Sequence, residues 1–254
     1  MRRPVTLIEV PYHAGLEGVG VGAGPRAILK AGADAVLAYR GMPAQVEHVR
    51  MRDMRSRGLD AIVDVNRLLR AAVRTAVEQE SLPVVLAGNC AASIGVLAGL
   101  EPASTGIVWL DRHADFNTPE TSPSGSVDGM ALAVAAGHCH DDLRFRSGLE
   151  NPVPEDRICL PFSWDLDPAE RVRLEASAIS NDYPLGTDAT YVHLDVDVVG
   201  AEGENLERAF DILRVAMTEL PAGALCVANY NPETDSDGRV LSGALRLLRA
   251  VAEA

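Results

Sequence analysis

The chain has 254 residues, of which 47% are hydrophobic and 4% aromatic, and its formal net charge is −13. This length is compatible with one α/β domain over residues 1–254, and the acidic balance argues against nucleic acid or an anionic membrane as a partner. The early apolar run Val5–Val10 is too short for a signal peptide or a membrane span. The four cysteines form no C-x-x-C pair, so we expect a reduced, cytoplasmic protein.

Strand-like and helix-like segments alternate along the whole sequence. The expected strands are residues 5–10, a weak one around 44–49, then 83–87, 107–110, 157–160, 191–198 and 224–228. The expected helices are residues 26–39, 59–80, a short one ending at Leu100, then 130–136, 165–176, 204–220 and 240–252. This alternation predicts an α/β fold, in which helices cover both faces of a mostly parallel sheet.

The stretch from Ile107 to Pro119 begins as a buried strand and ends in polar side chains. Asp111, His113 and Asp115 occupy alternate positions in it. Alternate residues of a strand point to the same side, and ligands of open α/β sheets bind beyond the carboxyl ends of the strands. Either these side chains converge on a metal ion, or they are a solvated and a capping aspartate at a strand end.

A second strand-like stretch, Tyr191–Val199, favours the metal site. Asp195 and Asp197 are again two residues apart, and we expect them on one face. Two carboxylates about 4 Å apart repel each other by about 4 kcal/mol at an effective dielectric of about 20. A group of four therefore needs divalent cations to remain ionised. A two-metal hydrolytic centre, in which bridging carboxylates and a hydroxide join the ions, uses such ligands.

Further motifs occur in a fixed order along the chain. They are Gly24-Pro25-Arg26-Ala27-Ile28, the stretch 111–118 (DRHADFNT), the stretch 124–130 (SGSVDGM), Leu194-Asp195-Val196-Asp197 and Asn231-Pro232. Together they resemble the motifs G-P-x-A-I, D-A-H-A-D-x-N-T, S-G-N-x-H-G-M, F-D-x-D and E-x-N-P of the arginase/agmatinase/formiminoglutamase (ureohydrolase) family. The resemblance runs nearly end to end and implies an arginase-like fold, a three-layer α/β/α structure.

The resemblance also implies a cofactor of two Mn²⁺ ions, which activate water for attack on a guanidinium carbon. By position, Asp111 and Asp195 correspond to the carboxylates that bridge the two ions. Asp115 corresponds to a ligand of the first ion that also hydrogen-bonds the hydroxide. His113 and Asp197 correspond to the residues that complete the second ion.

Other positions correspond to substrate contacts or to none. Asn117 and Ser124 match positions that hold the amino-acid end of the substrate in arginases. His193 lies on the metal-facing side of its expected strand, but the family has no ligand there, so we expect it to pack or to support a ligand.

One departure from the family pattern concerns the first ion. The motif G-G-D-H-S is Ala87-Gly88-Asn89-Cys90-Ala91 here, so Cys90 stands where a histidine ligand is expected. A divalent ion favours the thiolate form of cysteine, although manganese prefers oxygen and nitrogen ligands to sulfur. We expect Cys90 to bind the ion; the alternative is a small buried residue beside a weak or empty first site.

The other departures concern the substrate. Asp128 replaces a histidine that shuttles protons in arginases, and Asn229 replaces a glutamate that contacts the guanidinium. Ser126 replaces an asparagine of the same loop, and the segment after Asp197 is shorter than in the family. We therefore expect Asp128, together with Asp115, to be catalytic, and Ser126 and Asn229 to bind substrate. An N-hydroxyguanidine fits these changes, because its oxygen lowers the basicity of the group and less proton transfer is needed.

Cysteine at the ligand position without the shuttle histidine resembles the family branch that makes hydroxyurea and L-ornithine for D-cycloserine biosynthesis. We therefore expect hydrolysis of the guanidino compound Nω-hydroxy-L-arginine, a step of antibiotic biosynthesis. One alternative is another ureohydrolase, of the arginase, agmatinase, guanidinobutyrase or formiminoglutamase type. Another is a catalytically silent arginase-fold protein that binds a ligand or a partner. Family members are often trimers or hexamers, but the chain stops at its last expected helix, which favours a monomer over a homo-oligomer.

Overall fold

The computed structural model describes residues 3–38, 41–51, 56–100, 105–200 and 203–253. Their main sheet has seven strands in the order β4-β1-β5-β9-β8-β6-β7, and neighbouring strands are parallel. The strands are β1 (Val5–Val10), β4 (Gln45–His48), β5 (Leu82–Ala87), β6 (Thr105–Leu110), β7 (Ile158–Phe162), β8 (Ala189–Asp195) and β9 (Ala222–Ala228). A small antiparallel pair, β2 (Tyr12–His13) and β3 (Leu16–Glu17), lies outside this sheet.

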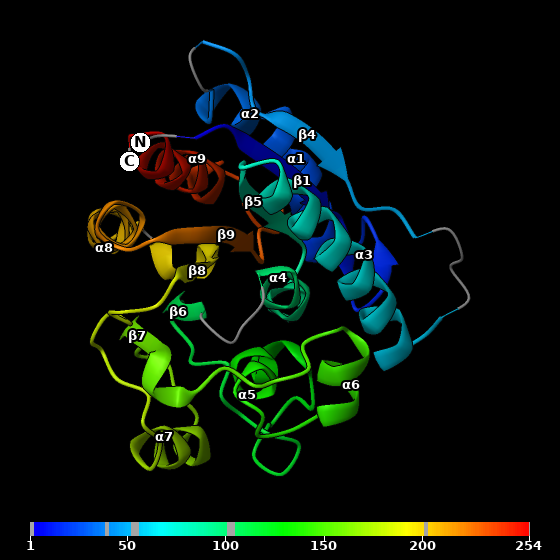
Figure 1. The fold of residues 1–254 in the computed structure, drawn as a ribbon, viewed down its shortest axis with the longest axis vertical. Helices are drawn as coiled ribbons and strands as arrows, with labels where there is room; N and C mark the ends of the chain where they lie inside the picture. The colour runs from blue at the N-terminus through cyan, green and yellow to red at the C-terminus, as the bar shows by residue number, and fades with distance from the viewer. Residues whose placement is uncertain (1–2, 39–40, 52–55, 101–104, 201–202, 254) are drawn as a thin grey trace.

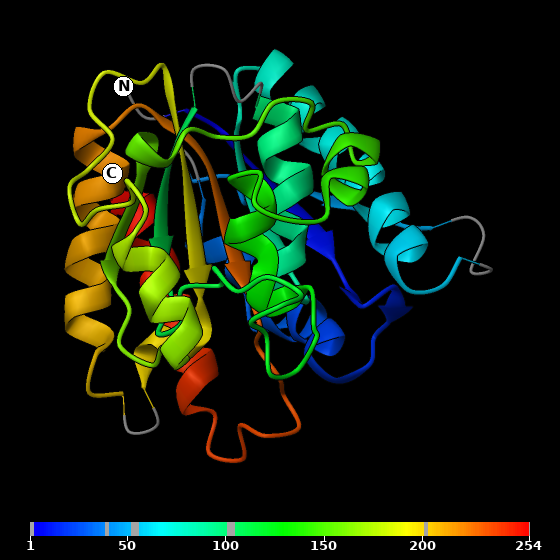
Figure 2. The same cartoon turned by 90° about the horizontal axis from the view of Figure 1, so that it is seen from below.

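Helices cover both faces of the sheet, which gives three layers (Figures 1 and 2). One layer contains α3 (Leu59–Glu78), α4 (Ser93–Leu100), α5 (Ala131–Ala135) and α6 (Asp141–Arg146). The opposite layer contains α1 (Gly24–Lys30), α2 (Ala33–Val36), α8 (Leu206–Glu219) and α9 (Arg239–Glu253). The predicted three-layer α/β/α fold is confirmed. No helix within the described ranges is long and apolar enough to cross a membrane.

Alternate residues of the strands belong to two separate cores. In β5, Val84 and Leu86 belong to the core on the side of α1, α8 and α9, whereas Val85 and Ala87 belong to the core on the side of α3 and α4. All six residues of β5 are buried, as expected of a parallel strand that is covered on both sides. Burial on both faces of the sheet explains why the sequences of the expected strands are continuous apolar runs.

The structure differs from the sequence prediction in several places. The expected helix 26–39 is two helices, because the chain turns at Gly32 with φ of 96°; residue 39 lies outside the described residues. The short helix α6 was not predicted. The expected strand 191–198 ends at Asp195 and continues as the 3-10 turn η6 (Val196–Val199). The other 3-10 turns are η1 (Gly20–Ala23), η2 (Cys90–Ala92), η4 (Asp128–Met130) and η5 (Glu155–Arg157).

Candidate dinuclear metal centre

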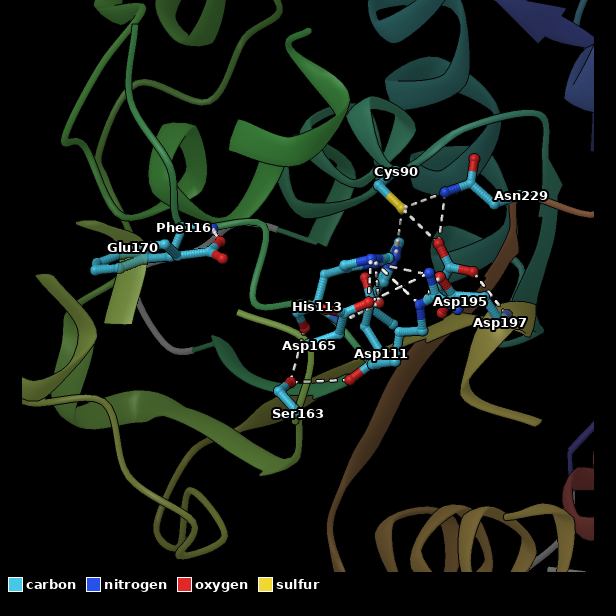
Figure 3. A network of polar contacts seen from close by, with 12 residues as sticks. Cys90, Asp111, His113, Phe116, Ser163, Asp165, Glu170, Asp195, Asp197 and Asn229 are labelled. Atoms are coloured by element: carbon cyan, nitrogen blue, oxygen red, sulfur yellow. Dashed lines mark hydrogen bonds and ion pairs between the residues drawn. The ribbon is translucent and has the colours of Figure 1, made fainter. Parts of the chain in front are cut away.

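Four neighbouring strands direct their carboxyl ends toward the candidate site. Cys90 lies in the segment after β5, Asp111 follows β6, Asp195 ends β8 and Asn229 follows β9. Because β5, β9, β8 and β6 are adjacent and parallel, these positions lie at one edge of the sheet. Figure 3 shows their side chains turned toward one another.

Tight turns, rather than strand alternation, bring the acidic residues together. After β6, the Asp111 carboxylate accepts a hydrogen bond from the His113 backbone N–H at 2.8 Å, and Asp115 has a positive φ of 50°. After β8, the Asp195 carboxylate accepts the equivalent bond from the Asp197 N–H at 2.9 Å. Aspartate favours such turns because its side chain can bond its own backbone two residues on. The residues converge as expected, but the explanation by alternate positions along strands is wrong.

Gly88 allows Cys90 to approach the other strands. A Cβ atom at Gly88 would lie 2.1 Å from the backbone oxygen of Tyr12. Only glycine fits such a close backbone approach. The next residues form η2, which places Cys90 in the interior with 1% of its surface exposed.

Asp111, His113 and Asp197 form one group of side chains that can hold an ion. This group, here called the outer cluster, contains the expected ligands of the second ion. His113 Nδ1 lies 3.3 Å from Asp111 Oδ1 and 3.2 Å from Asp197 Oδ2. Hydrogen bonds to these two carboxylates raise the pKa of His113 to about 10. Arg112 Nε also lies 3.4 Å from Asp197 Oδ2. In the metal-free protein, a proton on His113 therefore holds the outer cluster together.

Cys90, Asp111, Asp115 and His193 form another such group, and all four are buried. This group, here called the inner cluster, contains Cys90 and Asp115, the expected ligands of the first ion. One potential ligand atom from each lies within 4.8 Å of those of the others. Burial raises the pKa of the Cys90 thiol well above its usual value, and Asp115 and other carboxylates raise it further. Burial lowers the pKa of His193 to about 3, so its imidazole is neutral. Asp111 belongs to both clusters, as a bridging ligand requires.

Asp195 also joins the two clusters, although it belongs to neither group. Its Oδ2 atom accepts a hydrogen bond from Cys90 Sγ at 3.3 Å, whereas its Oδ1 atom accepts the bond from the Asp197 N–H. One carboxylate oxygen thus faces the inner cluster and the other faces the turn that carries the outer cluster. This placement fits the bridging role that the family resemblance implies for Asp195.

The electrostatics of the clusters fit divalent cations. Burial raises the pKa of Asp111 to about 7 and raises the pKa values of Asp115 and Asp195 well above their usual range. Three buried carboxylate oxygens have no hydrogen-bond partner among the described residues: Asp111 Oδ2, Asp115 Oδ2 and Asp197 Oδ1. A buried polar atom without a partner is costly, and a bound cation removes that cost. The thiol, imidazole and carboxylate groups are donors that transition-metal ions accept.

A cavity of about 300 Å³ opens onto the clusters. Its lining includes the expected substrate and catalytic residues Asn117, Ser124, Ser126, Asp128 and Asn229. The predicted ligands His113, Asp115, Asp195 and Asp197 also line it. The more deeply buried Cys90 and Asp111 do not.

Asp128 and Asn229 both lie beside the inner cluster. Asp128 Oδ1 accepts a hydrogen bond from the Ala91 N–H at 3.2 Å, and burial raises the pKa of its carboxyl to about 6. Asn229 donates from Nδ2 to Cys90 Sγ at 3.1 Å and also contacts Asp195 Oδ2. The amide of Asn229 therefore supports the metal ligands as well as lining the cavity.

Sequence reasoning missed two acidic residues that line the same cavity. Asp167 Oδ2 accepts a hydrogen bond from Asn117 Nδ2 at 3.0 Å, and Glu170 Oε1 accepts one from the Phe116 N–H at 2.9 Å. Together they form the capping box of α7 (Pro168–Glu175). The sequence D-P-A-E at 167–170 indicates a helix start, but it does not show that this start faces the site.

Comparisons with known proteins agree with the fold and identify the family. The sequence profile of the Arginase family matches residues 3–202. An arginase from Bacillus caldovelox is 32% identical over 183 residues, which cover 66% of this chain and 60% of the relative. An arginase from Bacillus subtilis is 30% identical over 189 residues, which cover 70% of this chain and 64% of the relative. The chain thus spans less than two thirds of the length of these relatives.

Solved structures show the same fold. The crystal structure of arginase from Bacillus subtilis superposes with a TM-score of 0.87 at 23% identity, covering 99% of both chains. Formimidoylglutamase from Bacillus subtilis superposes with a TM-score of 0.72 at 11% identity, covering 100% of this chain and 87% of that one. The profile match covers most of the sequence, and the chain belongs to the arginase family.

Proposed function

We propose that this protein is a dinuclear metal hydrolase that converts Nω-hydroxy-L-arginine and water to L-ornithine and hydroxyurea. One observation carries the proposal: the residues that depart from the family pattern gather at the inner cluster and the cavity beside it. Cys90 lies in that cluster, Asn229 donates to its sulfur, and Asp128 bonds the backbone next to it. As in the family branch that the sequence resembles, the reaction would serve D-cycloserine biosynthesis.

Two Mn²⁺ ions are the proposed cofactor. Asp111 and Asp195 would be shared between the ions, because each faces both clusters. Cys90 and Asp115 would hold the inner ion, whereas His113 and Asp197 would hold the outer one. When bound, the ions supply a water molecule that is activated for attack on the guanidine carbon.

The side chains around the cavity supply the proton transfers. Asp115 Oδ2 is buried without a partner, so it can accept a hydrogen bond from the attacking water. When the water oxygen bonds to the guanidine carbon, the bond from that carbon to the δ-nitrogen of ornithine breaks. This nitrogen must take up a proton. Asp128 lines the cavity with a carboxyl pKa of about 6, and we assign it as the donor.

The charges of the cavity fit the substrate at both ends. Asn229 places an uncharged amide beside the ions, which suits the weakly basic N-hydroxyguanidine better than a guanidinium. Asp167 and Glu170 place acidic groups on the cavity wall, where they would attract the substrate's ammonium group. Asn117 and Ser124 carry polar groups that can donate hydrogen bonds to its carboxylate.

Hydrolysis of L-arginine is a second candidate, because the relatives named above are arginases. A panel of L-arginine, Nω-hydroxy-L-arginine, agmatine, guanidinobutyrate and formiminoglutamate, assayed with manganese-loaded protein, separates these substrates. The proposal predicts turnover of the hydroxylated amino acid above all others. A silent binding protein would turn over none of them, but the unpartnered buried oxygens of three aspartates argue for bound metal.

A further inference from the structure

His193 is a buried histidine to which the metal centre proposed above gives no role. It lies on β8 with 0% of its surface exposed. Its ring stacks on that of Trp109, with centroids 3.7 Å apart and an interplanar angle of 12°. The two residues are paired in register on the neighbouring strands β8 and β6. The strand pairing and the stacking together fix the position of the imidazole.

Tyr191 holds the ring nitrogen that faces away from the site. Its hydroxyl lies 2.7 Å from His193 Nδ1 and also contacts the Cys226 thiol. In the tautomer that carries its proton on Nδ1, the Tyr191 hydroxyl accepts this N–H and Nε2 keeps a lone pair that can bind an ion. That atom lies 3.2 Å from Cys90 Sγ. Histidine ligands of metal ions show this arrangement, with one nitrogen on the ion and the other in a hydrogen bond.

The four side chains of the inner cluster lie close enough together to bind one ion, to which the shared Asp195 would add a further ligand. Two donors bonded to one ion at about 2.0 to 2.3 Å lie at most about 4.6 Å apart. One atom each from Cys90, Asp111, Asp115 and His193 lies within 4.8 Å of the others. Asp111 Oδ2 and Asp115 Oδ2, the unpartnered buried oxygens, belong to two of the four residues. A cation here would satisfy both oxygens and receive sulfur and nitrogen donors as well.

We propose that His193 Nε2 is a ligand of the inner ion and supplies the nitrogen donor that the family places at the position of Cys90. The inference rests on the proposed dinuclear centre, but it concerns one ligand of it. In the family pattern the nitrogen donor lies in the segment after β5, whereas here it lies on β8, in the sheet. Cys90 adds a sulfur donor at the former position. On ion binding, the Cys90 thiol gives up its proton to solvent and the neutral imidazole gives up none.

The test is a titration of the metal-free protein with Co²⁺, followed by absorption and by X-ray absorption spectroscopy. Cobalt bound to a thiolate gives a charge-transfer band in the near ultraviolet, and X-ray absorption counts the imidazole ligands. The main variant is His193→Leu, because leucine fills a similar volume and carries no donor atom. It is expected to weaken binding of the inner ion at least about 100-fold and to lower the imidazole count, with the outer ion unaffected.

Two further variants keep the test sharp. His140→Asn is the matched control, since His140 lies outside both clusters and its left-handed φ of 49° suits asparagine; it should bind both ions as the wild type does. The exchange Cys90→His/His193→Ala returns a nitrogen donor to the segment after β5. It should restore inner-ion binding to within about tenfold of wild type and abolish the thiolate band. Recovery of binding in this variant, which also lacks His193, would show that weak binding by His193→Leu is not merely the result of poor folding.

The results separate this inference from the proposed function. Unchanged inner-ion affinity and imidazole count in a folded His193→Leu protein would overturn the assignment of His193 and leave the dinuclear centre intact. A wild-type protein that binds no Co²⁺ at either cluster would overturn the dinuclear centre itself.

Discussion

His113 Nδ1 lies 3.2 Å from Asp197 Oδ2, and this contact joins the loop after β6 to the turn after β8. The same nitrogen lies 3.3 Å from Asp111 Oδ1. One ring atom therefore faces both carboxylates of the outer cluster, in the place that an ion would share. A proton on His113 and a divalent cation compete for this position.

Metal binding should release protons. The raised pKa values of His113 and Cys90 mean that both carry a proton at pH 7.5 when metal is absent. Filling both clusters should release at least about two protons per protein, measured with a pH indicator in weak buffer during Mn²⁺ addition. The Cys90→Ser variant should release about one proton fewer. Release of no protons by the wild type would show that these groups do not bind the metal.

The stability of the metal-free protein should fall as pH rises. Folding raises the pKa of Asp111 from 3.8 to about 7 and that of His113 from 6.5 to about 10. A group with a raised pKa contributes stability below its unfolded value, and this contribution is lost as pH rises through its folded value. The two windows together extend from pH 3.8 to about 10.

Bound ions should remove this loss. We expect the difference in Tm between loaded and metal-free protein to widen from pH 5 to pH 8 and to reach at least about 5 °C. The Asp111→Asn variant should show a smaller pH dependence of Tm in the metal-free state. A gap that narrows with rising pH would contradict the assigned protonation states.

Asp128 should be needed for turnover rather than for binding. Asp128→Asn removes the proton donor and is expected to lower kcat about 10²–10⁴-fold with little change in KM. Because the acid must be protonated, wild-type kcat should decline as pH rises through the pKa of this carboxyl, which burial raises to about 6 in the metal-free protein. The kcat of the Asp128→Asn variant should not show this decline with pH, whereas the kcat of Asp128→Glu should. A variant with unchanged kcat would exclude Asp128 as the donor.

Asp167 should act on substrate binding. Asp167→Asn removes a charge from the cavity wall, and its bond from Asn117 Nδ2 at 3.0 Å is weakened. The variant also loses the charged partner of the substrate's ammonium group. A hydrogen bond to a charged group contributes about 1.5–3 kcal/mol, so KM should rise about 10- to 150-fold while kcat changes little. Glu175→Gln, an exposed charge change at the other end of α7, is the control. Equal effects of the two variants on KM would show a general charge effect instead of a contact.

The strands that carry the site could be predicted from the sequence because their burial on both faces leaves continuous apolar runs. The beginning and end of β5, β6 and β9 lie within two residues of the expected positions. The expected helix 26–39 continues past Gly32, because the periodicity of apolar residues alone cannot show the left-handed turn at that residue. The short helix α6 has only six residues, DDLRFR, too few for a clear apolar stripe.

The sequence predicted that several residues of the candidate site come together, but it did not predict their geometry. Asp111, His113, Asp195 and Asp197 come together through side-chain to backbone turns, which a pattern of alternate residues cannot distinguish from a strand. His193 was expected to pack, and its stacking on Trp109 agrees. That its Nε2 also faces Cys90 depends on strand register and rotamer, which one sequence does not reveal.

Hydrolysis of an N-hydroxyguanidine is the proposed activity, and the release of ornithine measures it. Manganese-loaded protein is assayed in parallel on Nω-hydroxy-L-arginine and on L-arginine, with metal-free protein as the blank. We predict ornithine and hydroxyurea from the hydroxylated substrate and little ornithine from L-arginine. Equal or faster release from L-arginine would contradict the assignment and make the protein an arginase that tolerates Cys90.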